Sequence, residues 1–98
     1  MAKKITAKKG SETMGFGAAI EALKQGRWIA RKGWNGKGMH VYLEDMRQVV
    51  IGAGVFKGTA RRYEPHIVMF TAQGAHQPGW LASQADMLAE DWVLVVPQ

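Results

Sequence analysis

Two tryptophans in loop-like contexts are the residues of this chain best suited to binding chemistry. Trp34 and Trp80 each follow a glycine, whereas Trp28 and Trp92 are flanked by strand-forming apolar residues and are expected in the core. An indole in a loop can stack on a nucleobase, which contributes about 1 to 3 kcal/mol per base, and nearby Arg or Lys side chains can bind phosphates. The alternative is that each loop tryptophan covers a small core.

Stacking alone is too weak for tight capture of a nucleotide. Two stacked bases would supply about 2 to 6 kcal/mol, while nanomolar affinity requires about 12 kcal/mol. Phosphate contacts and a closed, preorganised pocket would have to supply the remainder. We therefore expect a ligand with several phosphates that is deeply buried.

The residues needed for catalysis or metal binding form no recognisable pattern. His40, His66 and His76 do not include the helical pair of a metal site. The chain has no cysteine, which excludes disulfides, thiolate metal sites and a cysteine nucleophile. Ser83 and Asp86 have the spacing of a helix cap rather than of a catalytic pair. We expect a binding protein without metal or cofactor, and not an enzyme.

The positive charge is concentrated in the first two thirds of the chain. The net charge is +5, and residues 24–62 contain nine Lys or Arg against two acidic residues, a net charge of +7. This distribution favours an anionic partner. No apolar run approaches the roughly 20 residues of a membrane helix, and the basic start lacks the apolar stretch of a signal peptide. We expect no membrane association and a cytoplasmic location.

The sequence indicates a single ligand-binding domain over residues 14–98, preceded by a tail. Residues 1–13 contain four lysines and almost no apolar residues, which predicts a flexible basic tail. The apolar spacing after it predicts a helix over about 17–25, with Gly26 as its left-handed cap. A second helix is expected to begin after Ser83 and to run through Asp86 to Ala89, with Met87 and Leu88 facing inward.

The remaining residues predict extended structure. A strand over 28–31 is expected to return over 39–43 through a Gly-rich segment in which Asn35-Gly36 is a strong turn signal. Residues 44–62 predict an irregular excursion with one weak strand. Further extended segments are expected over 66–70, after the Gln73-Gly74 turn, and over 92–96. Two short helices and four or five strands suit a small antiparallel sheet, and the predicted class is α+β.

Two sets of residues resemble one known family. Ala18 to Gly26, Arg31 to Met39 and Pro65-His66-Ile67 are similar to the start and middle of the type-two Thoeris anti-defence family of phages and prophages. The segment from Trp80 to Trp92, Trp-Leu-Ala-Ser-Gln-Ala-Asp-Met-Leu-Ala-Glu-Asp-Trp, resembles the closing signature of that family. The resemblance covers about residues 16–96, which is nearly the whole chain without the tail.

The resemblance implies a phage-encoded sponge. Members of this family bind cyclic ADP-ribose-type signals made by bacterial immune TIR-domain proteins and sequester them unaltered, which keeps the Thoeris effector inactive. Some relatives also bind cyclic oligonucleotide signals. The family assembles as a homo-oligomer, typically a tetramer, with ligand pockets at subunit interfaces.

The same resemblance implies which residues contact the ligand. They are Trp34, Asn35 and Gly36 from the first motif, Trp80, Ser83, Gln84 and Asp86 from the closing signature, and, as weaker candidates, Phe16 and Arg31. Apart from the resemblance, Asn35 could equally serve the turn, and the polar residues of the closing signature could equally cap and solubilise a helix. Residues 44–62 match no motif of the family.

Two alternatives remain open at the level of sequence. The basic segment 24–62 and the basic tail also suit a small nucleic-acid-binding module, although we consider a nucleic-acid partner the weaker hypothesis. A structural phage component without a small ligand is the third possibility.

Overall fold

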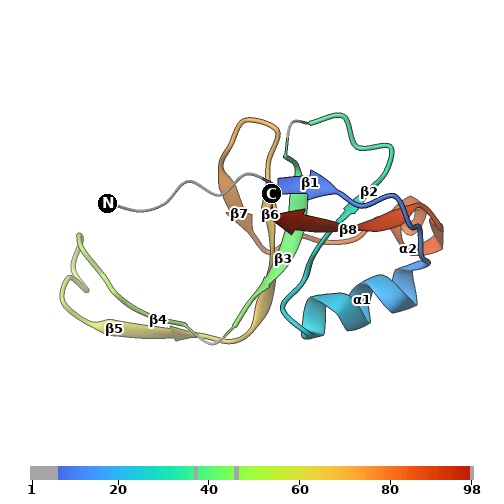
Figure 1. The fold of residues 1–98 in the computed structure, drawn as a ribbon. Coiled ribbons are helices and arrows are strands. Elements are labelled where there is room, and N and C mark those ends of the chain that lie inside the picture. The colour runs from blue at the N-terminus through green and yellow to red at the C-terminus, as the bar shows by residue number, and fades with distance from the viewer. Residues whose placement is uncertain (1–6, 37, 46, 98) are drawn as a thin grey trace.

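The computed structural model describes residues 7–36, 38–45 and 47–97. Its centre is a six-stranded antiparallel sheet in the order β1-β8-β2-β3-β6-β7, and a two-stranded hairpin, β4-β5, projects from one end (Figure 1). The elements in chain order are β1 (Ala7–Lys9), α1 (Phe16–Lys24), β2 (Trp28–Arg31), β3 (His40–Glu44), β4 (Arg47–Val50), β5 (Ala60–Tyr63), β6 (His66–Phe70), β7 (His76–Pro78), α2 (Gln84–Leu88) and β8 (Trp92–Pro97). Antiparallel strands with two short helices agree with the predicted α+β class.

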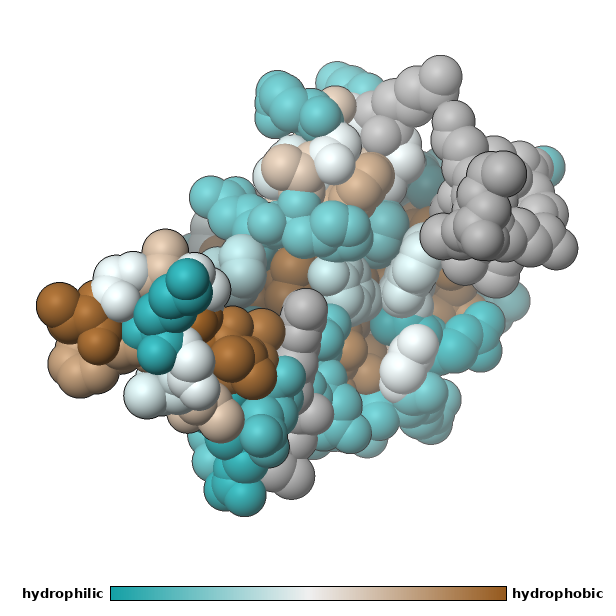
Figure 2. All heavy atoms as spheres, turned by 90° about the vertical axis from the view of Figure 1, so that its left-hand side faces the viewer, coloured by the Kyte–Doolittle hydropathy of each residue, from teal (hydrophilic) through white to brown (hydrophobic). Residues whose placement is uncertain are grey.

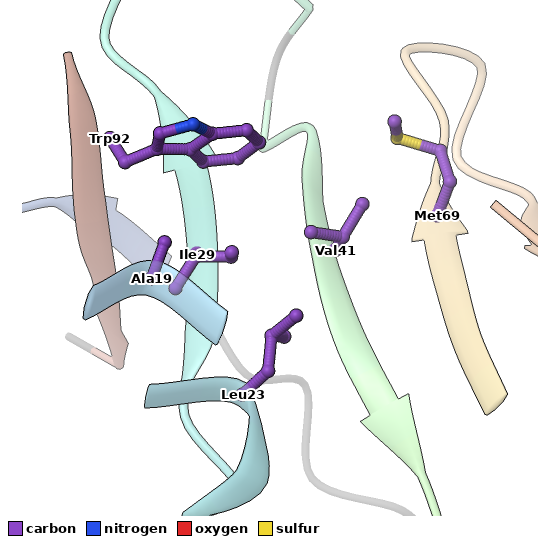
Figure 3. Close-up of a cluster of buried hydrophobic side chains, with 6 residues drawn as sticks. All are labelled: Ala19, Leu23, Ile29, Val41, Met69 and Trp92. Carbon is purple, nitrogen blue, oxygen red and sulfur yellow. The ribbon is translucent and has the colours of Figure 1, made fainter. Parts of the chain in front are cut away.

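The core lies between α1 and one face of the sheet. α1 contributes Ala19 and Leu23, and the strands contribute Ile29, Val41 and Trp92, all with at most 2% of their surface exposed (Figure 3). Burying one such large aliphatic or aromatic side chain contributes about 1.5 to 3 kcal/mol. These contacts hold α1 against the middle of the sheet.

The first helix confirms its sequence prediction at both ends. α1 has its last helical residue at Lys24, and Gly26 follows with a φ of 81°. The Gly26 amide donates to the Leu23 carbonyl at 2.9 Å, and the Arg27 amide donates to the Ala22 carbonyl at 3.0 Å. Glycine adopts this left-handed conformation without the penalty that a side chain would bring.

The second helix is capped as predicted, but its apolar side chains do not face inward. Ser83 and Asp86 form a reciprocal capping box at the start of α2. Met87 and Leu88 are 45% and 80% exposed, so the prediction that they pack into the core is wrong. The inner side of α2 is occupied instead by Asp86, whose carbonyl accepts a 2.9 Å hydrogen bond from Nε1 of the buried Trp92.

The segment predicted to be an irregular excursion is mostly an ordered hairpin. β4 and β5 pair from Arg47↔Tyr63 to Val50↔Ala60, and the prediction of one weak strand is therefore wrong. All four residues of β5 are exposed. The sequence of β5 therefore lacks the alternation of apolar and polar residues that indicates a strand. The glycines of this segment lie in the connecting turn. We refer to residues 47–63 as the arm.

The N-terminal segment pairs with the sheet where the structure describes it. Residues 1–6 lie outside the described residues, so the predicted flexible tail stays a prediction there. Ala7–Lys9 forms β1 along β8, and Met14 bridges to Trp92. Pairing uses backbone groups of the β8 edge and needs no apolar side chain, which is why the lysine-rich composition did not indicate a strand.

The other face of the sheet carries a row of aromatic rings. The ring of His40 stacks on Trp28, with centroids 4.1 Å apart, and on Phe70, at 5.2 Å. Only 4% of His40 is exposed, and its Nδ1 lies 2.6 Å from the Gly38 carbonyl oxygen. Burial lowers the pKa of His40 because it disfavours the charged ring, although the contact with Gly38 opposes this effect.

Neither helix in the described part of the chain has the length and hydrophobicity needed to cross a membrane.

The lowered pKa of His40 predicts a loss of stability in mild acid. The unfolded chain binds a proton in the ordinary histidine range while folded His40 resists it, so the free energy of unfolding should fall as the pH decreases through that range. His40→Gln should flatten this dependence, which urea unfolding at about pH 8 and about pH 5 would measure. Equal slopes in the wild type and in the His40→Gln variant would contradict the prediction.

Candidate functional site

Three segments that are distant in sequence bring aromatic rings together around Trp92. Trp34 lies in the β2–β3 loop, Trp80 lies between β7 and α2, and Phe16 begins α1. Their ring centroids lie 5.4, 6.1 and 5.7 Å from that of Trp92, and Trp34 and Trp80 lie 6.4 Å from each other. The structure therefore unites three of the predicted site residues, and it adds Trp92, which the sequence assigned to the core alone.

The positions of Trp34 and Trp80 suit both roles that the sequence left open. Both pack against the buried core, as a lid would, and both remain partly exposed. The planes of the two indoles are inclined by 75°. A planar ligand ring that stacks on one indole would thus lie nearly perpendicular to the other.

Arg31 holds the segments that carry these rings through two ion pairs. Its Nε donates to Oδ1 of Asp91 at 2.9 Å, and its Nη1 donates to Oδ1 of Asp86 at 3.2 Å. The hydrogen bond with Arg31 lowers the pKa of Asp91, and the same bond raises the pKa of Arg31. β2, α2 and the start of β8 are thereby connected at one point.

Asp91 is a residue of this site that the sequence analysis missed. Besides pairing with Arg31, its Oδ2 accepts a 3.4 Å hydrogen bond from the Gly33 amide, and its carbonyl accepts a 2.8 Å bond from the Lys32 amide. These bonds fix the loop one residue before Trp34. An acidic residue next to an apolar strand carries no sequence signal for this role, because its partners lie about 60 positions away.

The β2–β3 loop is longer than the Asn-Gly signal suggested. β2 ends at Arg31 and β3 begins at His40, and neither Asn35 nor Gly36 has the positive φ of a two-residue hairpin turn. The hairpin prediction is confirmed, but the turn closes through the Met39 amide, which donates to the Gly36 carbonyl at 3.1 Å. On the other side of the loop, Nζ of Lys9 donates to the Trp34 carbonyl at 2.6 Å.

The remaining predicted site residues differ in exposure and in their contacts. Asn35, Ser83 and Gln84 are exposed. Asp86 is occupied on both oxygens, since Oδ2 accepts from the Ser83 amide at 3.0 Å and Oδ1 pairs with Arg31. Gly36 lies against Ala72, and a methyl group at this position would come within 2.7 Å of the Ala72 Cβ.

A separate groove of about 510 Å³ lies between the sheet and the arm. It is lined by Tyr42, Glu44, Val49, Tyr63, His66, Val68, His76, Pro78 and Gly79. None of the nine predicted site residues lines it. Within the described ranges, no group of three or more His, Asp or Glu residues has the geometry of a metal site.

The close approach at Gly36 predicts a steric penalty for any side chain there. Gly36→Ala should force the loop away from Ala72 and lower the free energy of unfolding by about 1 to 3 kcal/mol, measured by urea unfolding. Gly33→Ala is the matched control, because a methyl group at Gly33 would lie 3.7 Å from the nearest atom, at Asp91. Equal stability of the two variants would show that the loop moves away from Ala72 without lowering the free energy of unfolding, and would contradict the prediction.

The ion pair of Asp91 predicts a stability term that depends on pH. Asp91→Asn should lower the free energy of unfolding by about 1 kcal/mol at neutral pH, because the pair is only partly exposed. Since the pKa of Asp91 is lowered by folding, the wild type loses this term as the pH falls through the folded pKa, and the difference between the two proteins should then vanish.

Glu64→Gln is the control for Asp91→Asn. Its partner Arg62 lies 3.7 Å away, and both side chains are more than 60% exposed. This substitution should change stability by no more than a few tenths of a kcal/mol. A difference for Asp91→Asn that persists unchanged in acid would contradict the assignment.

Comparison with known proteins agrees with the resemblance seen in the sequence. A family model described as a Thoeris anti-defense 2-like domain matches residues 14–95. A relative from Bacillus phage SP01, named "Thoeris anti-defense 2", is 38% identical over 85 residues, which cover 84% of this chain and 94% of that protein. The matched region contains every residue of the aromatic cluster and of the Arg31 ion pairs. The chain belongs to the Thoeris anti-defense 2-like family.

Proposed function

We propose that this protein binds cyclic ADP-ribose isomers or related cyclic nucleotides in the cytoplasm of the host bacterium and sequesters them unaltered. By removing the signal, it keeps the Thoeris effector inactive. Family membership supports the anti-defence role. The observation that carries the ligand class is the pairing of Trp34 and Trp80, two partly exposed indoles from separate segments, at one site.

The surroundings of these indoles suit a nucleotide. Trp34 or Trp80 would stack on the base, which contributes about 1 to 3 kcal/mol. The exposed side chains of Asn35 and Gln84 offer amide groups that can donate to and accept from a base or a ribose. Lys32 is exposed beside Trp34 and offers a cation for phosphate.

Arg31 and Asp86 act mainly as positioning residues in this proposal. The guanidinium of Arg31 is engaged by Asp86 and Asp91, so it fixes the loops rather than approaching the ligand. The same engagement occupies both carboxylates with ion pairs to Arg31, which is unsuited to general acid or base catalysis. Sequestration without cleavage is therefore the mechanism that we propose.

The proposed assembly is a homo-oligomer, a tetramer in the typical case, with ligand pockets at subunit interfaces. On a single copy, one side of the two indoles faces solvent. A second copy would cover this side and form the closed pocket that tight binding needs. No cofactor and no metal take part in the proposal.

The test is isothermal titration of the protein with cyclic ADP-ribose isomers, followed by heating of the complex and mass spectrometry of the released ligand. Tight binding with recovery of the intact ligand is expected. Recovery of a cleaved product would establish a hydrolase instead. Absence of heat with every isomer and with cyclic oligonucleotides would overturn the proposal.

A conservative tryptophan substitution tests the site itself. Trp34→Ala would remove packing against the core, so Trp34→Phe is the sharper variant, and it should weaken binding about 10-fold through loss of stacking area. Trp28→Phe is the matched control, because Trp28 is also partly buried but lies on the other face of the sheet. Equal affinities of the two variants would place the ligand elsewhere.

The basic residues of the arm support nucleic-acid binding as a second candidate function. Residues 47–63 contain Arg47, Lys57, Arg61 and Arg62 and no acidic residue. A polymer bound by these charges would lose affinity steeply with salt, because phosphate counterions are released on binding. Tight, salt-sensitive binding of single-stranded DNA together with no binding of cyclic nucleotides would favour this alternative.

A further inference from the structure

Residues 32–34, which we call the Trp34 segment, are fixed through their main chain. The Lys32 amide donates to the Asp91 carbonyl at 2.8 Å, and the Gly33 amide donates to the Asp91 carboxylate at 3.4 Å. Asp91 thus holds two donors of the segment. The carbonyls of the segment need a donor instead.

The donor is the side chain of Lys9 in β1. Its Nζ donates to the Trp34 carbonyl at 2.6 Å and to the Lys32 carbonyl at 3.2 Å. We call this pair of bonds the tether. Hydrogen bonds from a charged donor are shorter and stronger than those between neutral groups. One ammonium group therefore fixes both ends of the Trp34 segment.

Apolar contacts do not fix the main chain of this segment. Lys32 and Gly33 are exposed, and the indole of Trp34 is the part of the segment that packs on the core. The exposed large apolar side chains of the described residues lie elsewhere, on the arm, where Figure 2 shows them, and over residues 81–88. The course of the main chain through the Trp34 segment therefore depends on its hydrogen bonds.

β1 holds Lys9 in position by pairing with the edge of the sheet. Lys9 lies opposite Val95 of β8 (Figure 1). β8 begins at Trp92, and Asp91 directly precedes it. The tether thus connects the Trp34 segment, through β1, to the same strand whose start anchors it on the other side.

β1 lies outside the part of the chain that the family model matches. The match covers residues 14–95, whereas β1 ends at Lys9. No motif of the family resemblance therefore assigns a role to Lys9. The composition of this region predicted only a flexible basic tail.

We propose that β1 is an accessory element of the site formed by Trp34 and Trp80, and that Lys9 is a positioning residue that holds the Trp34 segment in its ligand-binding conformation. Without the tether, the segment would adopt other conformations as well. The apparent dissociation constant would then rise in inverse proportion to the fraction of molecules that remain competent to bind. The inference rests on the proposed function where it concerns the ligand, whereas the tether can be measured on the protein alone.

Amide hydrogen exchange followed by NMR tests the tether without a ligand. Lys9→Met removes the donors and keeps a long unbranched side chain. The Lys32 and Trp34 amides should exchange at least about 5-fold faster in this variant, because the segment opens more often. The amides that join β3 and β6 should keep their wild-type rates, which shows that the sheet is intact.

Lys8→Met is the matched control for the exchange measurement. Lys8 is the neighbouring residue of β1, its side chain is exposed, and its substitution removes the same charge. The Lys32 and Trp34 amides should exchange in this variant as they do in the wild type. Unchanged rates in Lys9→Met, or equal acceleration in both variants, would overturn the tether.

Isothermal titration with a cyclic ADP-ribose isomer that the wild type binds tests the consequence for the site. Lys9→Met should weaken binding about 5- to 10-fold, and Lys8→Met should stay within about twofold of the wild type. Lys9→Arg should restore most of the affinity, because a guanidinium has enough donors for both carbonyls. Wild-type affinity in Lys9→Met would contradict the positioning role, as would a Lys9→Arg variant that binds no more tightly than Lys9→Met.

A salt series separates positioning from direct contact with a phosphate. A charge that contacts the ligand from an exposed position loses its effect as the salt concentration rises, because ions screen it. The ratio of the affinities of the wild type and Lys9→Met should therefore be the same at about 0.05 M and about 0.5 M salt. A ratio that approaches one at high salt would make Lys9 a phosphate contact and overturn the positioning role.

The two proposals fail in different ways. If the wild type binds cyclic ADP-ribose isomers and Lys9→Met binds them equally well, the positioning role fails and the sponge function stands. If no isomer binds while exchange is accelerated in Lys9→Met, the tether stands and the ligand assignment fails.

Discussion

The indole of Trp92 has no exposed surface, and rings from three separate segments pack against it. Its Nε1 donates to the Asp86 carbonyl, which fixes the orientation of α2. A single buried side chain therefore joins the start of α1, the β2–β3 loop, the segment before α2 and the last strand. A tryptophan suits this position because its large apolar ring contacts several neighbours while its one polar group still needs a partner. The candidate ligand site is built on the outer side of this contact.

Ion pairs and a lysine hydrogen bond add to the contacts made by the indole of Trp92. The pairs of Arg31 with Asp86 and Asp91 lie at the edge of the aromatic cluster, and they connect β2 with α2 and with the residue before β8. The planar guanidinium can bond two carboxylates in fixed directions, which an ammonium group cannot do. Lys9 of β1 adds a further bond, to the Trp34 carbonyl. The loop that presents Trp34 is thus held from both sides, and a loop held in this way would reduce the entropy cost of binding the proposed ligand.

The sequence predicted the elements whose signals are local and misjudged those that depend on distant partners. α1 with its cap at Gly26, the capping box at Ser83 and the apolar strands all follow from spacing within a few residues. β1 and β5 pair through backbone groups and have little apolar content, so no periodic pattern indicated them. In the candidate site, the rings of Trp34 and Trp80 were identified from their context and family motifs. Asp91 was missed because its partners, Arg31, Lys32 and Gly33, lie about 60 positions away.

The exposed side chains of Met87 and Leu88 on α2 show why apolar character alone is an unreliable guide to burial. A helix of five residues has room for one inward-facing turn, and here that turn is taken by the polar residue Asp86, which caps the helix, pairs with Arg31 and accepts the bond from Trp92. Met87 and Leu88 are consequently turned outward by the requirements of the site. The same constraint that orients α2 toward the indole cluster thus leaves an apolar surface beside that cluster.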